Sequence, residues 1–297
     1  MKLGFIGLGR MGKNMVYNLK DKGHSVIANN RSPKPVNEVK RKGIQTAYSI
    51  EELVRKLPKQ KIIWLMVKSG KPVDLLISQL LPHLKKGDII IDGGNSYFKD
   101  SIKRHNQLKK KNIHFLDCGT SGGMEGARRG ACMMVGGNKA AFKKTERLFK
   151  DMCVKDGYGY MGNSGAGHFV KMVHNGIEYG MMSAIAEGMA AVRNSSKHFK
   201  TDIKTAAKVY AHGSIIESRL MSWFLTALNS KEFKSISGEV PKGETEDEMK
   251  HLEGISKMPI LHQSRLMRIQ SRKKPSFEGK AIAAMRNQFG GHAVKKK

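Results

Sequence analysis

The chain opens with a glycine-rich turn between a short apolar segment and an amphipathic one, and this feature constrains the fold most. Residues 2–6 have the composition of a buried strand, and Gly7, Gly9 and Gly12 follow in the spacing Gly-x-Gly-x-x-Gly. Residues 13–20 then show helical periodicity, and a second strand is expected over 24–28. Such glycines allow a tight turn that brings a pyrophosphate close to a helix N-terminus. The pattern predicts a dinucleotide-binding loop made of Gly7, Leu8, Gly9, Arg10, Met11 and Gly12.

The end of the second predicted strand indicates which dinucleotide is preferred. An acidic residue there would bind the ribose hydroxyls of NAD, but the sequence reads Asn29-Asn30-Arg31-Ser32. Arg31 can stack on adenine and pair with a 2′-phosphate, while Asn30 and Ser32 can donate hydrogen bonds to that group. We therefore expect NADP to be the preferred cofactor and NAD the second choice. The alternative interpretation is an Arg31 that simply points to water.

Further strands are expected at residues 61–67, 88–92, 113–117, 132–135 and 157–161, which continues an α/β rhythm. In open parallel sheets, ligands bind beyond the carboxyl ends of the strands. The loops that follow three of these strands are therefore candidate ligand contacts, although Gly-Gly and Asn-Ser pairs also occur in ordinary turns. The cofactor candidates are Val67, Lys68, Ser69 and Asn95, and the substrate candidates are Asn95, Ser121, Gly122 and Gly123.

A second glycine-led segment, residues 165–179, carries a face of unusual chemistry. On a helix, five polar side chains fall on one face, and the apolar residues between them would form the core side; the five are Lys171, His174, Asn175, Glu178 and Tyr179. A lysine among apolar neighbours can accept a proton from an alcohol, and a carboxyl group two turns away can handle protons at another carbon. The alternative is an ordinary solvated charged face.

The rest of the chain predicts helices at about 166–195, 202–212, 216–229 and 258–272, with a polar, acidic stretch over 235–254 that leads into a short helix. We therefore expect a Rossmann-like α/β domain over residues 1–164 and an all-α domain over 165–297. Near the end, Arg286 is a candidate phosphate fork and His292 a candidate hydrogen-bond donor. The alternative for both is a surface position.

Composition excludes some classes of protein. The formal net charge is +29, from 54 Lys and Arg against 25 Asp and Glu, but the lysines are spread along the chain without an aromatic-interleaved or zinc-type motif. This distribution argues against a nucleic-acid role and leaves attraction of phosphorylated ligands or a general lysine bias. No apolar run approaches the roughly 20 residues of a membrane span. Three cysteines without metal spacing predict reduced thiols, no metal site and a cytoplasmic location.

Taken together, the motifs resemble the 6-phosphogluconate dehydrogenase family in its shorter-chain form, over nearly the whole chain. The resemblance rests on four segments in the right order: residues 92–96 (Asp-Gly-Gly-Asn-Ser), 121–128 (Ser-Gly-Gly followed by Glu-Gly-Ala-Arg), 165–179, and 286–292. It implies oxidation of the C3 hydroxyl of 6-phosphogluconate with NADP or NAD, loss of carbon dioxide, and release of ribulose 5-phosphate, in a pentose phosphate or a gluconate-catabolic route.

The resemblance also implies roles for single residues. Lys171 would accept the C3 hydroxyl proton and later return a proton to the ketone oxygen, and Glu178 would protonate C1 of the enediol. The groups that would hold carboxylate, hydroxyls and phosphate are Asn95, Ser121, Gly122, Gly123, His174, Asn175 and Tyr179. In the family, the segment that corresponds to Arg286 and His292 enters the partner subunit's site, which implies a homodimer.

One segment departs from the family pattern. Where shorter members carry a Gly-Glu-Gly-Arg-Trp-Thr-like stretch near the substrate phosphate, counting back from Pro259 reaches residues 244–249, and the basic residue becomes Asp247. An acid would repel phosphate unless Lys242 or Lys250 compensates. Two alternatives therefore stay open: a related β-hydroxyacid dehydrogenase that acts on a smaller acid, and a catalytically silent nucleotide-binding protein.

Overall fold

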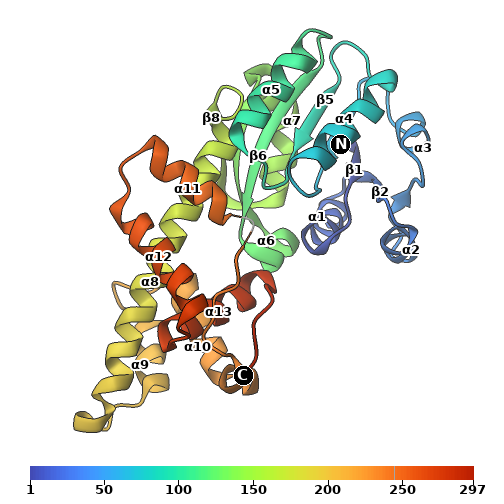
Figure 1. Ribbon diagram of the computed structural model, residues 1–297. Helices are drawn as coiled ribbons and strands as arrows, with labels where there is room; N and C mark the ends of the chain where they lie inside the picture. Colours follow the sequence, from blue (N-terminus) through green and yellow to red (C-terminus); the bar gives the residue numbers. More distant parts are fainter. Residues whose placement is uncertain (244) are drawn as a thin grey trace. The chain divides into compact units, whose positions relative to one another are not determined.

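The computed structural model describes residues 1–243 and 245–297, which form two compact units, Met1–Lys171 and Met172–Lys297 (Figure 1). Unit 1 holds one eight-stranded sheet in the order β3-β2-β1-β4-β5-β6-β7-β8. Its strands are β1 (Lys2–Ile6), β2 (Ser25–Asn29), β3 (Gln45–Thr46), β4 (Ile62–Leu65), β5 (Ile89–Asp92), β6 (His114–Ser121), β7 (Ala131–Gly137) and β8 (Cys153–Gly162).

Helices connect these strands and cover both faces of the sheet (Figure 1). They are α1 (Arg10–Asp21), α2 (Pro33–Arg41), α3 (Ile50–Arg55), α4 (Lys71–Leu80), α5 (Phe98–Lys109), α6 (Gly123–Arg129) and α7 (Lys139–Met152), with a 3-10 turn, η1, at Leu81–His83. Apolar residues of α1, α2, α6 and α7 form the core on one face, and those of α3, α4 and α5 form the core on the other. Since both faces are covered, the central strands read as continuous apolar runs, as in Ile89–Asp92.

The sheet is parallel from β3 through β6, and this places the loops after β1, β2, β4 and β5 at one edge. We call this edge, with residues 7–12, 30–32, 67–70 and 93–96, the carboxyl edge. Strand β7 runs antiparallel to β6, so the hydrophobic pattern located this strand without giving its direction. The parallel core and its flanking helices confirm the predicted Rossmann-like fold of the first half.

Unit 2 is helical. The helix α8 (Ala166–Phe199) begins in unit 1 and continues through the boundary between the units. It is followed by α9 (Ile203–Tyr210), α10 (Arg219–Asn229), the 3-10 turn η2 (Lys231–Ser235), α11 (Glu246–Ile255), α12 (Pro259–Lys273) and α13 (Phe277–Gly290). Its core contains Met182, Met221, Phe224 and Met285. The all-α character agrees with the sequence prediction, and α13 is a helix that the sequence analysis did not identify.

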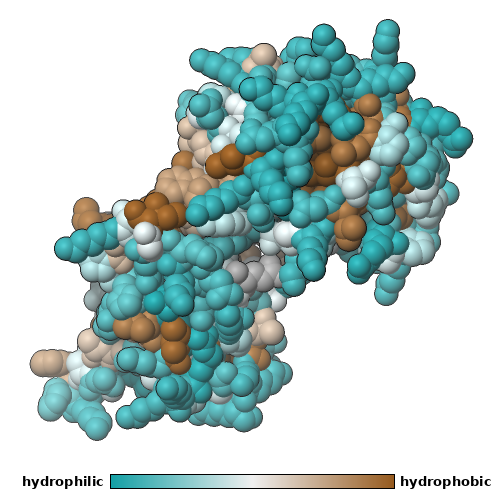
Figure 2. Space-filling model, turned by 45° about the horizontal axis from the view of Figure 1, so that its top comes forward, coloured by the Kyte–Doolittle hydropathy of each residue, from teal (hydrophilic) through white to brown (hydrophobic). Residues whose placement is uncertain are grey.

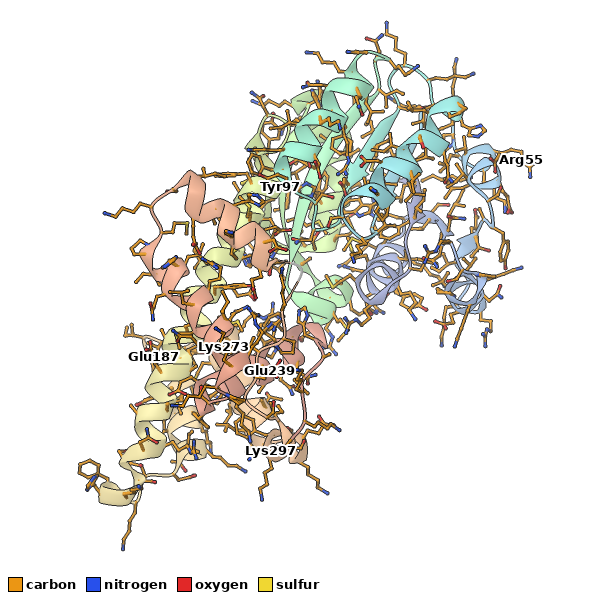
Figure 3. All side chains as sticks on the ribbon, viewed as in Figure 1. Arg55, Tyr97, Glu187, Glu239, Lys273 and Lys297 are labelled. Atoms are coloured by element: carbon orange, nitrogen blue, oxygen red, sulfur yellow. The ribbon has the colours of Figure 1, made fainter. Side chains whose placement is uncertain are left out.

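Polar side chains dominate the surface. Figure 2 shows hydrophilic residues over most of the visible face, in keeping with 54 Lys and Arg in the chain. Basic side chains such as Arg55 and Lys297 extend away from the ribbon (Figure 3) and are exposed. Among the described residues, none of the helices has both the length and the apolar character needed to span a bilayer.

Candidate active site

The glycine loop after β1 leaves room for a ligand at the start of α1. A Cβ atom added to Gly12 would lie 2.0 Å from the carbonyl oxygen of Gly7, so that glycine is required for packing of the helix against the turn. A Cβ atom added to Gly9, the N-cap of α1, would meet no protein atom within 4 Å. The first turn of α1 also contains no acidic residue. An open N-terminus with free space beside Gly9 fits a dinucleotide pyrophosphate.

The second loop of the carboxyl edge is tied to the glycine loop by one amide side chain. Asn30 accepts a hydrogen bond from the backbone N–H of Leu8 (3.0 Å), and its own amide nitrogen donates to the carbonyl and hydroxyl oxygens of Ser32 (3.2 and 3.0 Å). Asn30 therefore holds the two loops together, whereas the sequence analysis expected it to donate to a phosphate. Arg31 is exposed beside them.

A buried arginine connects the other two loops of this edge. Arg104 on α5 is 2% exposed, and its Nη2 atom donates to the carbonyl oxygen of Gly70 (3.1 Å) while Nε donates to Asp74 (2.8 Å). Its Nη1 atom lies 3.4 Å from Asp92, the residue at the end of β5. Asp92 in turn accepts hydrogen bonds from the backbone of Gly94 and the hydroxyl of Ser96, so the loop that carries Asn95 is fixed from within.

The first turns of α8 are anchored on β6. Both carboxylate oxygens of Asp117 accept backbone N–H groups at the helix start, from Gly165 (2.7 Å) and His168 (2.9 Å). Gly119 on the same strand allows close contact, since an added Cβ atom would lie 2.3 Å from Cβ of Lys171. These contacts place Lys171, which is 9% exposed, beside the end of β6. The loop Ser121–Gly123 begins two residues after Gly119, at the end of that strand.

The part of α8 in unit 2 also turns its polar face inward. The Nδ1 atom of His174 lies 3.2 Å from the amide oxygen of Asn175 and 4.0 Å from the Oε2 atom of Glu178. Tyr179 is 4% exposed, whereas Ile177 on the face that the sequence analysis assigned to the core is 56% exposed. The expectation for Ile177 was therefore wrong. The alternative of a solvated charged face is also wrong for Lys171 and Tyr179.

Sequence reasoning missed Arg268 on α12, which is a buried cation of unit 2. Its guanidinium lies 3.3 Å from the centre of the Tyr179 ring, and its Nε atom has no hydrogen-bond partner among the described residues. Burial lowers the pKa of Arg268 to about 10. An arginine on an amphipathic helix is usually exposed, so sequence periodicity alone gave no signal for this one.

Arg286 on α13 is the second buried cation. Its Nη1 atom donates to the carbonyl oxygen of Pro241 (2.8 Å) in the same chain, and the side chain is 7% exposed. Burial also lowers the pKa of Arg286, and the phenol of Tyr179 opposes this shift most strongly. Within the chain, Arg286 is thus a buried member of unit 2 rather than a surface residue, whereas His292 is exposed.

Two more arginines of α12 pair with carboxylates. Arg265 forms a bidentate ion pair with Glu253 (2.7 and 3.0 Å), and Arg272 forms one with Glu246 (2.8 Å for both bonds). We call the four side chains of unit 2 together the arginine cluster: Arg265, Arg268, Arg272 and Arg286. Arg268 and Arg286 have no carboxylate within salt-bridge distance among the described residues.

The acidic segment expected to weaken phosphate binding is mostly compensated. Asp247 pairs with Lys242 at 3.0 Å, which is one of the two compensations that the sequence analysis suggested. The hydroxyl groups of Thr245 and Tyr179 share a hydrogen bond (3.1 Å). Glu244 lies outside the described residues. In residues 1–243 and 245–297, no group of three or more His, Cys, Asp or Glu side chains is placed to hold a metal ion.

The Rossmann-like sheet and the open glycine loop at its carboxyl edge are typical of NAD(P)-dependent oxidoreductases. Comparison with known proteins specifies the family. Residues 2–162 match the profile described as the NAD binding domain of 6-phosphogluconate dehydrogenase, and residues 167–197 match its C-terminal domain. A Bacillus subtilis (strain 168) protein, YqeC, provisionally named a 6-phosphogluconate dehydrogenase, is 44% identical over 100% of both chains. The chain belongs to the 6-phosphogluconate dehydrogenase family.

Other relatives of this chain include proteins of similar length and longer ones. The NAD(+)-dependent, decarboxylating enzyme of Haloferax volcanii is 37% identical over 100% of this chain and 99% of its own. The decarboxylating enzyme of Candida albicans is 48% identical, but the match spans 66% of this chain and 40% of that protein. The solved Plasmodium falciparum 6-phosphogluconate dehydrogenase superimposes with a TM-score of 0.84 at 30% identity, covering 92% of this chain and 62% of that one.

Proposed function

We propose that the protein catalyses oxidative decarboxylation of 6-phosphogluconate to ribulose 5-phosphate and carbon dioxide, with reduction of NADP or NAD. The observation that carries this proposal is the burial of Lys171 on α8. Lys171 is one of the five polar residues on the helix face that resembles the family motif. Relatives named as decarboxylating 6-phosphogluconate dehydrogenases match the chain, and the Plasmodium falciparum enzyme was solved in complex with its substrate 6-phosphogluconate.

The proposed chemistry uses two groups of α8. The amine of Lys171 takes the proton of the C3 hydroxyl, and the bound nicotinamide accepts the hydride from C3. The ammonium of Lys171 then returns a proton to the ketone oxygen as the bond to the carboxylate carbon breaks and carbon dioxide leaves. Glu178 donates a proton to C1 of the resulting enediol, which gives the ketose. The seven-residue spacing puts Glu178 on the same helix face, about 10 Å further along the axis.

Substrate and phosphate are held by groups from several elements. We propose that Asn95, Ser121, Gly122, Gly123, His174 and Asn175 orient the carboxylate and hydroxyls. For the phosphate, we propose Arg268 and Arg286 beside Tyr179, because both guanidiniums are buried without a carboxylate partner among the described residues. A guanidinium without a carboxylate matches a phosphate in charge and geometry. Arg268 is an addition to the residues predicted from sequence, and His292 stays a prediction.

The cofactor preference is the second part of the proposal. The glycine loop and residues Val67, Lys68 and Ser69 would hold the dinucleotide, and exposed Arg31 beside Ser32 would pair with a 2′-phosphate. The Plasmodium falciparum enzyme was solved in complex with its cofactor NADP+, whereas the Haloferax volcanii relative is named NAD(+)-dependent. The relatives thus include both preferences, and Arg31 is our reason to favour NADP.

We also propose a homodimer. Unit 2 exposes apolar side chains on its helices, and Ile177 and Met181 of α8, one turn apart, are 56% and 42% exposed. Such a pair is suited to burial against a second copy. Light scattering at several protein concentrations tests this, with a monomer at all concentrations as the contrary result.

The reaction itself is tested by mixing the purified protein with 6-phosphogluconate and either NADP or NAD. Reduced cofactor is followed by absorbance and carbon dioxide by its release. We expect both products in equal amounts, formed faster with NADP. Reduced cofactor without carbon dioxide would contradict the decarboxylation step. Turnover only of a smaller, unphosphorylated β-hydroxyacid would favour that class of enzyme instead.

A further inference from the structure

Three described residues, Pro241, Thr245 and Glu246, contact the arginine cluster or the Tyr179 side chain beside it. The carbonyl oxygen of Pro241 accepts from Arg286 (2.8 Å), Thr245 bonds to the hydroxyl of Tyr179 (3.1 Å), and Glu246 pairs with Arg272. Thr245 and Glu246 belong to the segment that departs from the family pattern, residues 244–249. Glu246 therefore lies next to the proposed phosphate site.

Glu246 differs from Asp247, the acid that follows it. Its side chain is 10% exposed and binds both terminal nitrogens of Arg272 at 2.8 Å, whereas Asp247 is 71% exposed and binds a lysine. Glu246 is also close enough to Arg286 for its charge to counteract part of the lowering of the Arg286 pKa by burial. A buried carboxylate in that position acts on an incoming anion in two ways: it repels the anion, and it occupies the fork of Arg272.

We infer that Glu246 limits the affinity of the anion site. By occupying Arg272, it leaves Arg268 and Arg286 as the arginines of α12 and α13 that can pair with a phosphate. This inference rests on the proposed function for the identity of the substrate. The electrostatic effect of Glu246 itself applies to any phosphate-like anion that binds at this site. Its distinctive consequence is that removal of the Glu246 charge strengthens anion binding. A residue that only supports the fold would weaken binding when it is changed.

The test compares Glu246→Gln with Arg272→Met, and the probe is inorganic phosphate titrated by calorimetry. We expect Glu246→Gln to lower the phosphate Kd by roughly threefold to tenfold, the size expected for one partly screened charge. Arg272→Met leaves the carboxylate without its partner and should raise the Kd by a similar factor. The effect of Glu246→Gln should shrink at high salt, because screening weakens a charge effect but not a packing effect.

Asp247→Asn is the matched control, since it makes the same change in net charge at an exposed position of the same segment. Its phosphate Kd should stay within about twofold of the wild type. A folded Glu246→Gln protein with an unchanged or weaker affinity overturns the inference. If Glu246→Gln does not fold, an unchanged Kd in Arg272→Met overturns it. Because phosphate binding needs no turnover, a wild-type protein that is inactive on 6-phosphogluconate would defeat the proposed function alone.

Discussion

The carboxyl edge of unit 1 and the arginine cluster of unit 2 hold charged side chains in different ways. At the carboxyl edge, the buried guanidinium of Arg104 pairs with Asp92 and Asp74, and its Nη2 atom also donates to the backbone carbonyl of Gly70. In the cluster, Arg268 is equally buried but packs on the Tyr179 ring with one nitrogen unbonded among the described residues. An arginine paired with carboxylates can fix loops, whereas we propose that Arg268, which lacks such a partner among the described residues, binds the substrate phosphate.

The largest expected effect concerns neither arginine but the lysine beside the end of β6. We expect Lys171→Met to reduce kcat for 6-phosphogluconate by about 10²- to 10⁴-fold, because a general base would be lost. The dinucleotide Kd, measured by fluorescence quenching, should stay at the wild-type value since the glycine loop is untouched. Turnover within tenfold of the wild type would remove Lys171 from the mechanism.

The next effect tests Arg104, the arginine paired with carboxylates. Arg104→Gln leaves the buried Asp92 carboxylate without its cation, which typically destabilises a protein by about 3–5 kcal/mol. Thermal unfolding should show a clear drop in Tm, and the KM values of both cofactor and substrate should rise, because two loops lose their common anchor. Lys103→Gln changes an exposed neighbour on the same helix and serves as the control. A Tm like that of the control would show that Arg104 does not anchor these loops.

Arg268, which lacks a carboxylate partner among the described residues, should behave in the opposite way. Arg268→Met removes a cation that has no carboxylate partner, so stability should change little, while the KM for 6-phosphogluconate should rise about 10- to 100-fold through loss of a charged hydrogen bond worth about 1.5–3 kcal/mol. Lys273→Met, at the exposed end of the same helix (Figure 3), should leave KM unchanged. A large loss of Tm with normal KM would make Arg268 a structural residue like Arg104, and the comparison would fail.

The smallest effect concerns the exposed end of the carboxyl edge. Arg31→Ala should raise the KM for NADP by roughly fivefold, the equivalent of about 1 kcal/mol for a solvent-accessible pairing, and leave the KM for NAD within twofold. Lys34 is also exposed and lies in the first turn of α2. Lys34→Ala is therefore the control for the loss of one positive charge near this site. Equal changes for both cofactors would mean that Arg31 does not read the 2′-phosphate.

The comparison also explains how much the sequence could predict. The carboxyl edge follows from local patterns, because Gly7–Gly12 and the loop after Asp92 are short motifs beside apolar strands. The bonds of Asn30 to Leu8 and Ser32 could not be predicted in this way, since they depend on how two loops meet. No local pattern marks Arg268 as buried, because its partner Tyr179 lies 89 positions earlier in the sequence.

The acidic segment is an intermediate case. Glu246, Asp247 and Glu248 occupy the first turn of α11, where acids favour the positive end of the helix, so they signal a helix start as much as a charged loop. That signal was available in the sequence. The pairing of Glu246 with Arg272 was not, since it requires knowing that α11 and α12 present these side chains to each other.

The continuity of α8 has a consequence for how this gene can change. Helix α8 is unbroken over 34 residues and carries Lys171 and Glu178 on the same face. Since each residue turns a helix by about 100°, one inserted or deleted codon between them would swing Glu178 to another side of the helix without altering a single active-site residue. A substitution in this stretch changes one side chain and leaves the register intact, whereas a length change alters the register of every residue after it. The residue count of this stretch should be the most strictly retained feature among descendants of this chain, and a library of single-residue insertions would show it.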